Sequence, residues 1–502
     1  MCSSDLFYEN MAATTNNYRS LYIGRGVGGY GTMNVTGGSV LLGRRDGGAE
    51  VFGVGSGSGG TIGTPVGQVV VSGGEVVVTN KPGDGWNLLK IGANYGRGVF
   101  VVTNTGTVNL KAGGVSSRVT VGQSPYGNGL LRMDGGYMTI GDGVTVGYNT
   151  GYSGTVWATG TVEVTAGILD TGSGCTVGSA DNASGAGSGV GIANIYGGQL
   201  SESFWGVFVG RARLGGVAAG FMAVTNGLLN ILSSCDPETY GSAPNGGGFS
   251  GLAVGVINYN EANAATRASG LMTVSGSAII TNAGVLAIGV NGATGTLVQT
   301  GGAIRHAPIN AVARKFSAIG LGYGLTGVFG GGNGTYAMSG GTYYTPNPTF
   351  VGGIPTNFMF NSSSGSVGLL KITGGTFTAA NTMTVGGNGT GALTMGAAGA
   401  CAVQDLVLTN NTSSTLRFEL GPAGVGALSA SGTLTVCAGA KLEVDSTAYA
   451  GAAVWIKLVD CAARTTAFEP ENISVAGPGV VRQDRDQNIW LYIPRGTLIG
   501  VQ

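Results

Sequence analysis

A short pattern recurs along most of this chain: an apolar residue, any residue, a second apolar residue and then a glycine. Met383-Thr384-Val385-Gly386 is one copy. The pattern ends at twelve glycines: Gly24, Gly43, Gly92, Gly122, Gly147, Gly178, Gly210, Gly255, Gly289, Gly320, Gly352 and Gly386. Seven of the eleven spacings between them lie between 30 and 34 residues. A fixed period of about 20 to 50 residues indicates a stacked-repeat architecture.

Residues within each repeat alternate with a period of two, which predicts β-strands rather than helices. The two apolar residues should point inward, and the residue between them should face the opposite side. Such pairs are Leu21/Ile23, Leu89/Ile91, Val119/Val121, Val144/Val146, Val207/Val209, Leu252/Val254, Leu286/Ile288 and Met383/Val385. Stacked at the strand spacing of about 4.8 Å, they would form continuous apolar ladders. The closing glycines would supply a positive φ where a Cβ atom would clash. We therefore predict an all-β, single-stranded parallel β-helix, or β-solenoid, with about 31–34 residues per coil.

Composition supports an ordered repeat protein and narrows its partners. Glycine provides 100 of the 502 residues, without the every-third-residue period of collagen. Hydrophobic residues make up 43% of the chain and alternate regularly, which argues against disorder. Lys+Arg and Asp+Glu number 24 each, so the chain lacks the charge that would favour nucleic acid or an anionic membrane surface. No run of about 18 apolar residues occurs, so no transmembrane helix is predicted.

The first residues differ in character from the repeats. Residues 1–6, Met-Cys-Ser-Ser-Asp-Leu, resemble the translation of a common sequencing adapter, and residues 7–20 are polar. We therefore expect residues 1–20 to combine an adapter artefact (1–6) with an incomplete N-terminal segment. A signal peptide upstream of that segment would have been lost with it.

Three segments lengthen the period: residues 44–66, 228–251 and 256–270. Insertions in a solenoid leave as loops on one face, which is often the binding face. We interpret these three as surface decoration, with a binding role as the alternative.

The sequence changes after about residue 415. Strand signals continue without glycine pairs, at residues 416–420, 433–436, 441–444, 454–459 and 489–493, and charged residues become denser. An open solenoid end is an unpaired sheet edge that must be covered. We predict that the parallel β-helix covers residues 21–415 and that residues 416–502 hold the last coils and a C-terminal β cap.

Several of these units resemble a known repeat family. Leu-Lys-Ile-Thr-Gly-Gly-Thr-Phe (370–377), the stretch 383–395 and the closing Trp-Ile-Lys-Leu-Val-Asp (455–460) are similar to the autotransporter-associated β-strand repeats of large bacterial surface proteins. The resemblance covers most of the chain and rests on small residues and strand alternation. It implies an exported, glycine-rich, right-handed β-helix at the cell surface or outside the cell, acting as a non-enzymatic passenger, stalk or adhesin. The membrane-anchoring β-barrel of that family has no counterpart in this sequence.

The alternative function is a carbohydrate-active β-helix, such as a polysaccharide lyase or glycoside hydrolase. Those sites need paired carboxylates or an acidic calcium cluster. No Asp or Glu lies between Glu261 and Asp405, and Asp484 and Asp486, an acidic pair two residues apart, are interpreted as a solvated turn. We therefore predict no catalytic residue and no calcium-bound glycine-aspartate repeat.

The single histidine lies near the only candidate binding residues. His306 is most simply a surface turn residue, and one histidine cannot build a zinc site without cysteines. Residues 303–316 and 342–349 occupy equivalent places on successive coils, which would bring aromatic rings beside hydrogen-bond donors. We therefore predict a glycan-contact patch made of Arg305, His306, Arg314, Lys315, Tyr343 and Tyr344. Surface glycans and further copies of the chain are the predicted partners.

The cysteines predict no metal or cofactor. No C-x-x-C motif occurs. Cys175 falls at an inward ladder position, where it would be a small buried apolar residue. Cys401 and Cys437 are about one coil apart, so they could stack and form a disulfide in an oxidising compartment.

Overall fold

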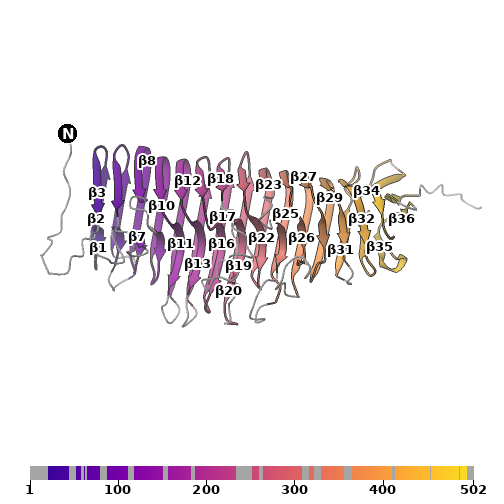
Figure 1. Ribbon diagram of the computed structural model, residues 1–502, viewed down its shortest axis with the longest axis horizontal. Coiled ribbons are helices and arrows are strands. Elements are labelled where there is room, and N and C mark those ends of the chain that lie inside the picture. The colour runs from indigo at the N-terminus through magenta and orange to yellow at the C-terminus, as the bar shows by residue number, and fades with distance from the viewer. Residues whose placement is uncertain are drawn as a thin grey trace, which may run out of the picture. The chain divides into compact units, whose positions relative to one another are not determined.

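The computed structural model describes residues 21–43, 52–57, 62, 65–79, 87–110, 118–150, 156–181, 187–232, 251–258, 264–307, 316–321, 330–354, 365–409, 413–452, 454–484 and 487–494. The chain divides into two compact units, Met1–Val285 (unit 1) and Leu286–Gln502 (unit 2). Strands dominate both units, and Figure 1 shows them as successive arrows. No α-helix occurs among the described residues.

Three strand positions recur in unit 1. The first position carries the apolar–any–apolar–glycine pattern, in β1 (Leu21–Arg25), β4 (Phe52–Ser56), β7 (Asn87–Ala93), β9 (Arg118–Gln123), β11 (Gly143–Thr150), β13 (Gly174–Asp181), β16 (Val207–Arg213) and β19 (Gly251–Ile257). The second holds β2 (Tyr30–Val35), β5 (Val66–Val71), β8 (Arg97–Leu110), β10 (Asn128–Ile140), β12 (Trp157–Thr171), β14 (Ser188–Ile195), β17 (Val217–Thr225) and β20 (Arg267–Ser275). The third holds β3 (Ser39–Gly43), β6 (Glu75–Thr79), the second halves of β8, β10 and β12, and then β15 (Gln199–Glu202), β18 (Leu228–Ile231) and β21 (Ile279–Asn282).

Unit 2 repeats the arrangement, and its second and third positions are joined in single strands, as they are in β8, β10 and β12. The first position holds β22 (Val285–Val290), β24 (Ser317–Leu321), β26 (Thr349–Val351), β28 (Met383–Val385) and β30 (Leu406–Leu408). The combined second and third positions hold β23 (Thr294–His306), β25 (Asn333–Thr345), β27 (Val367–Ala379) and β29 (Thr390–Val403). The last strands are β31 (Ser414–Glu419), β32 (Ala427–Val436), β33 (Lys441–Asp445), β34 (Trp455–Arg464), β35 (Ile473–Ala476), β36 (Val480–Gln483) and β37 (Ile489–Tyr492), with a 3₁₀ turn at Pro470–Asn472.

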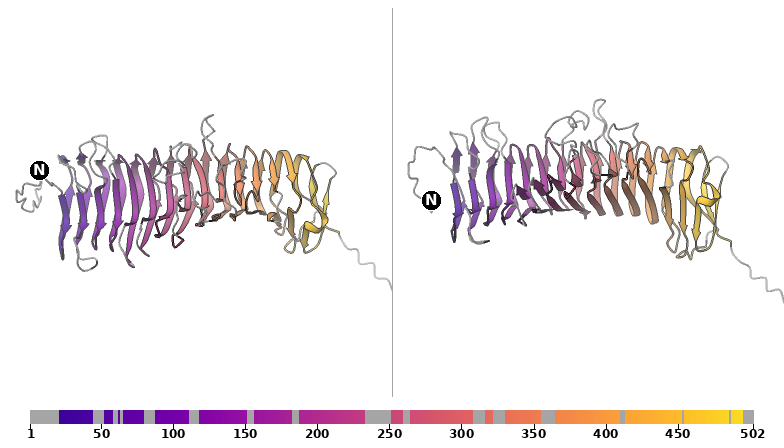
Figure 2. Two further views of the ribbon diagram at one scale, coloured as in Figure 1. Left: turned by 60° about the horizontal axis from the view of Figure 1, so that its bottom comes forward. Right: turned by 90° about the horizontal axis from the view of Figure 1, so that it is seen from below.

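Strands in the same position of successive repeats pair in parallel, which gives a solenoid-like stack within each unit (Figure 2). In unit 1 the second apolar residue of the pattern forms one column: Ile23, Val54, Ile91, Val121, Val146, Val177, Val209 and Val254. From Val54 to Val254 the members of this column are 0% exposed. The predicted inward ladder is therefore confirmed, and it forms the core.

The closing glycines adopt the predicted backbone conformation, with one correction. Gly92 and Gly122 have φ values of 63° and 69°, and the other predicted closing glycines except Gly43 are also positive. Gly55, with a φ of 59°, closes the pattern between Gly24 and Gly92, because Phe52-Gly-Val54 pairs with β1 and β7. The assignment of Gly43 as a closing glycine was wrong: it ends β3, a third-position strand.

A second glycine column, absent from the sequence prediction, lies directly beside the first. In unit 1 it runs through Gly31, Gly67, Gly98, Gly129, Gly160, Gly191, Gly220 and Gly270 in register. A Cβ atom on Gly92 would lie 1.8 Å from the carbonyl oxygen of Asn128 and 2.7 Å from the nitrogen of Gly129. The two strand positions therefore meet backbone to backbone, which only glycine permits.

The middle residue of the pattern faces away from the core, and in several repeats it is also buried. Thr120 is 0% exposed, Ala253 is 1% exposed and Phe350 in unit 2 is 4% exposed, whereas Lys90 and Thr176 are half-buried. Strands of a parallel sheet that are buried on both faces are expected to be rich in small and apolar residues. In those repeats the first strand position is therefore covered on both faces.

Parallel pairing changes to antiparallel near the C-terminal end of unit 2. β33 pairs in parallel with β35, whereas β37 pairs antiparallel with both β34 and β36. Two shorter repeats precede this change, since Leu370 is in register with Leu393 and Leu393 with Leu416, each 23 residues later (393 − 370 and 416 − 393). Across the described ranges, no helix is long and apolar enough to cross a membrane.

The four cysteines that the structure describes, Cys175, Cys401, Cys437 and Cys461, are free thiols, so the predicted Cys401–Cys437 disulfide is wrong. The residue in register with Cys401 on β32 is Leu428 rather than a cysteine. Burial raises the pKa of Cys401 to about 12. Cys175 is 1% exposed, as its ladder position predicts.

Candidate functional site

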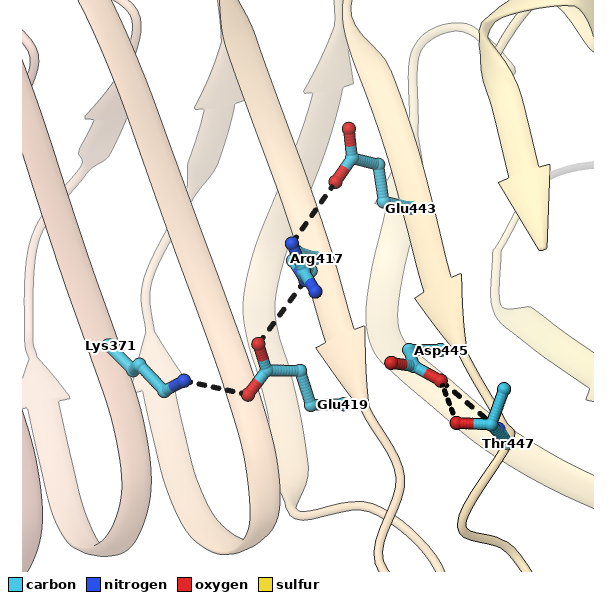
Figure 3. Close-up of polar contacts among 6 residues, drawn as sticks. All are labelled: Lys371, Arg417, Glu419, Glu443, Asp445 and Thr447. Atoms are coloured by element: carbon cyan, nitrogen blue, oxygen red, sulfur yellow. Dashed lines mark hydrogen bonds and ion pairs between the residues drawn. The ribbon is translucent and has the colours of Figure 1, made fainter. Parts of the chain in front are cut away.

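The densest group of charged side chains in unit 2 lies on the outer face of its last repeats (Figure 3). Lys371 on β27, Arg417 on β31 and Glu443 on β33 occupy one column, because β29 and then β31 continue the same register. Glu419 lies two residues beyond Arg417, so strand alternation places both side chains on the same face. The sequence analysis recognised residues 416–420 as a strand but did not single out these charged side chains.

These side chains form one continuous ionic network. The Lys371 ammonium donates to Oε2 of Glu419 at 2.8 Å, and Nε of Arg417 lies 3.3 Å from Oε1 of the same carboxylate. Nη1 of Arg417 lies 3.8 Å from Oε2 of Glu443. All four side chains are between 32% and 43% exposed, so solvent screens each pair. The network thus connects three strands through charges held at the surface.

Asp445, next to this network, is held in its ionised form. The hydroxyl of Thr447 donates to Oδ1 of Asp445 at 2.6 Å, and the backbone N–H of Thr447 donates to the same oxygen at 3.1 Å. The hydrogen bonds from Thr447, and secondarily the Arg417 charge, lower the pKa of the Asp445 carboxyl. Since a catalytic acid needs a raised pKa, Asp445 is poorly suited to donate a proton at neutral pH.

A second charged group lies on the outer face of unit 1. Nε of Arg132 on β10 is 2.7 Å from Oδ2 of Asp134 and 3.9 Å from Oε2 of Glu163 on β12. The hydroxyl of Thr165 donates to Oδ1 of Asp134 at 2.7 Å. Burial opposes ionisation of Asp134, but the hydrogen bonds from Thr165 and Arg132 outweigh it and lower the pKa of that carboxyl. This group again pairs its carboxylates with donors on neighbouring strands.

The predicted glycan-contact patch is not assembled as expected. Tyr343 and His306 are 1% and 4% exposed, so both side chains lie in the interior and their assignment to a surface patch is wrong. Arg305 and Tyr344 are exposed and in register on β23 and β25. Arg314 and Lys315 lie outside the described residues.

Tyr343 instead belongs to a buried polar and aromatic cluster. Its hydroxyl lies 2.6 Å from Oγ of Ser317 and 3.3 Å from Nε2 of His306. Its ring stacks on Phe377 with a centroid distance of 4.3 Å. Burial raises the pKa of the Tyr343 hydroxyl, so it remains protonated and acts as a hydrogen-bonding core group.

A shallow groove of about 450 Å³ crosses the glycine corners of unit 1. It is lined by residues that include Gly167, Gly198, Gly227, Gln199 and Asn226. None of the residues described as lining it is ionisable. The groove thus offers backbone, amide, hydroxyl and aliphatic groups but no acid or base for catalysis.

A column of aromatic side chains at one corner of unit 1 was missed by the sequence analysis. Tyr95, Tyr126 and Trp157 come from three successive repeats, and their ring centroids are 5.3 Å and 5.5 Å apart. A sequence signal exists, because Tyr-Gly-x-Gly occurs at both 95–98 and 126–129. The glycines of that motif take part in the backbone contacts described above. A reader of the sequence therefore attributes the motif to its glycines and overlooks the tyrosines.

In the described part of the chain, no group of three or more His, Cys, Asp or Glu side chains could hold a metal ion. No family model, curated protein or solved structure matches this chain.

Proposed function

We propose that this chain is a right-handed parallel β-helix that acts as a non-enzymatic structural protein of the passenger or adhesin type at a bacterial surface. The parallel register within each unit supports a β-helical course, and the antiparallel β36 and β37 would form its C-terminal cap. The proposed location at a bacterial surface is based on the similarity of residues 370–377 and 383–395 to autotransporter-associated repeats.

One observation supports the non-enzymatic part of this proposal: the clustered carboxylates are paired with cations or hydrogen-bond donors. Glu419 and Glu443 are paired with Lys371 or Arg417, and Asp134 is paired with Arg132 and Thr165. Glycoside hydrolysis instead needs one carboxyl kept protonated beside a second, ionised carboxylate. Each of these acids is thus held by a cation or a hydroxyl donor, and at least one partner in each cluster lies on another strand, which suits a role in joining repeats.

A direct assay tests this proposal against the carbohydrate-active alternative. The purified chain is incubated with neutral polysaccharides and with polyuronates, while new reducing ends and unsaturated uronates are measured. We expect no product above the buffer control. Product formation that is abolished by Glu419→Gln or Glu443→Gln would overturn the non-enzymatic role and place catalysis in the charged network.

The compartment needs its own experiment. The chain is epitope-tagged and expressed from its own gene in the native host, and intact cells are treated with an external protease. Loss of the tagged chain from intact cells is expected for a surface protein. Digestion only after cell lysis would contradict the surface assignment.

A further inference from the structure

Three aromatic residues from successive repeats contact one another at the corner of unit 1 where the second strand position begins. Tyr95 and Tyr126 rings are 5.3 Å apart, and Tyr126 meets Trp157 edge to face at 5.5 Å. Backbone hydrogen bonds fix the column, since Tyr95 N–H donates to the Pro125 carbonyl at 2.6 Å and Tyr126 N–H donates to the Trp157 carbonyl at 2.7 Å. The rings are therefore held on a rigid backbone.

The backbone at this corner favours glycine, yet two repeats carry tyrosine. Tyr95 has a φ of 73° and Tyr126 a φ of 53°. The turn 213–216 is closed by the same 3.1 Å hydrogen bond as the turn 93–96, and it places Gly215, with a φ of 83°, where Tyr95 stands. The fold therefore does not need a large side chain here. Bulky residues kept in a costly backbone conformation point to a function.

Hydrogen-bonding side chains run parallel to the aromatic column. Arg97, Asn128 and Thr159 each follow an aromatic residue by two positions and are in register with one another on β8, β10 and β12. Arg97 and Asn128 are exposed, and Trp157 is 38% exposed. The column of rings is thus accompanied, two residues further along each strand, by a column that contains a guanidinium, an amide and a hydroxyl.

We propose that this aromatic corner, made of Tyr95, Tyr126 and Trp157 with Arg97, Asn128 and Thr159, binds a carbohydrate chain. A pyranose ring presents an apolar C–H face that packs on an aromatic ring and hydroxyls that pair with amide and guanidinium groups. The inference rests on the proposed non-enzymatic function and adds a ligand class to it.

The available area favours a sugar over a protein partner. A whole aromatic side chain buries about 150–250 Å². Three partly exposed rings therefore offer far less than the roughly 800 Å² that each partner contributes to a stable protein interface. A narrow ligand such as an oligosaccharide suits this area, with its length running across the repeats.

The test compares the whole chain with a double variant, Tyr95→Gly/Tyr126→Gly, on a printed array of neutral and acidic oligosaccharides. Glycine suits both backbone conformations, so the variant keeps its fold, which hydrogen exchange of β8, β10 and β12 verifies. Tyr196→Ala removes a tyrosine from another part of unit 1 that is 46% exposed and serves as the matched control. We expect the intact chain and the control to bind, and the double variant to bind at least tenfold more weakly by calorimetry.

The outcomes separate this site from the proposed function. Absence of glycan binding by the intact chain, or equal binding by the folded double variant, would overturn the site and leave the non-enzymatic role unaffected. Binding to a glycoprotein probe that persists after enzymatic deglycosylation would assign the corner to protein and also overturn it. Binding that needs both tyrosines supports the site even if the bound oligosaccharide is then cleaved, although cleavage would overturn the non-enzymatic role.

Discussion

Lys371 on β27 and Glu419 on β31 form a 2.8 Å ion pair that passes over the strand between them, β29. The two residues are 48 positions apart in the chain. Because Glu419 also pairs with Arg417 at 3.3 Å, one carboxylate connects a cation on its own strand to a cation two strands away. Such a network adds lateral connections to a stack in which each repeat otherwise contacts only its neighbours.

Neutralising Glu419 should weaken this part of unit 2 slightly. The pairs are partly exposed, so Glu419→Gln is expected to cost less than about 1 kcal/mol at low salt. The effect should shrink at high ionic strength because salt screens exposed charges. Hydrogen exchange of β27 and β31 measures it, and Lys441→Met on β33, outside the network, is the control. Equal protection of both strands in wild type and variant at low salt would show that the network contributes nothing measurable.

Asp445 predicts a pH dependence with a defined sign. Its folded-state pKa is lowered, so the folded chain binds fewer protons than the unfolded chain, whose carboxyl titrates near pH 4. The stabilisation is fully present above that pH and is lost as the pH falls through the folded-state pKa. Asp445→Asn should therefore lower the unfolding midpoint of unit 2 at pH 7 and converge with wild type below about pH 4.

The hydroxyl of Thr447 provides the matched control for that titration. Thr447→Val removes the 2.6 Å side-chain hydrogen bond and keeps the backbone N–H bond at 3.1 Å. We expect an intermediate loss with the same direction of pH dependence. A difference between Asp445→Asn and wild type that grows as the pH falls would contradict the assigned cause.

The close contact between glycine columns predicts strong position dependence among glycines. Gly92→Ala should cost several kcal/mol or prevent folding, because its Cβ would meet the Asn128 carbonyl oxygen at 1.8 Å and the backbone has a φ of 63°. Gly37→Ala is the control, since nothing lies within 4 Å of its added Cβ and its φ is ordinary. Thermal unfolding of both variants checks the prediction, which fails if the two substitutions destabilise equally.

How much of this fold the sequence predicts depends on whether a signal has a fixed spacing. The inward pairs such as Val119/Val121 were predictable because period-two alternation is local. The second glycine column was not, because the number of residues that separates the two contacting glycines varies: Gly98 follows Gly92 by 6 positions (98 − 92), whereas Gly160 follows Gly147 by 13 (160 − 147). Gly55 could have been recognised as a closing glycine, since Phe52-Gly-Val54-Gly55 fits the pattern. It was overlooked because it lies in a glycine-rich stretch.

The glycan patch failed because it grouped residues that are adjacent in a strand. Successive side chains of a strand point to opposite faces, so Tyr343 and Tyr344 cannot both lie on the surface of one sheet, and the same holds for Arg305 and His306. The pairing of Ala303–Arg305 with Thr342–Tyr344 is uninterrupted, and Tyr343 is 1% exposed whereas Tyr344 is 45% exposed. Alternation therefore shows that only one member of each adjacent pair can be exposed, but it does not show which one.

Substituting these two tyrosines separately tests that assignment. Tyr343→Ala should cost about 3–5 kcal/mol, because it empties a buried site stacked on Phe377. Tyr344 is 45% exposed, so Tyr344→Ala should change stability by no more than about 0.5 kcal/mol. Chemical denaturation of unit 2 measures both, and a reversed order would show that the two rings have been assigned to the wrong faces.

Tyr95→Gly should leave the stability of unit 1 nearly unchanged, although it removes a whole aromatic ring. A non-glycine residue in the left-handed region costs about 1–2 kcal/mol, and glycine at a φ of 73° avoids that cost. Two effects of Tyr95→Gly destabilise the folded chain. Glycine makes the unfolded chain more flexible, which costs about 0.5–1 kcal/mol, and the contact with Tyr126 is lost, which costs a similar amount. Tyr95→Ala, which keeps a Cβ atom and loses the ring, should be less stable than Tyr95→Gly when thermal unfolding is compared. If alanine proved the more stable of the two, the positive φ at residue 95 would impose no strain, and the functional reading of this corner would lose its physical basis.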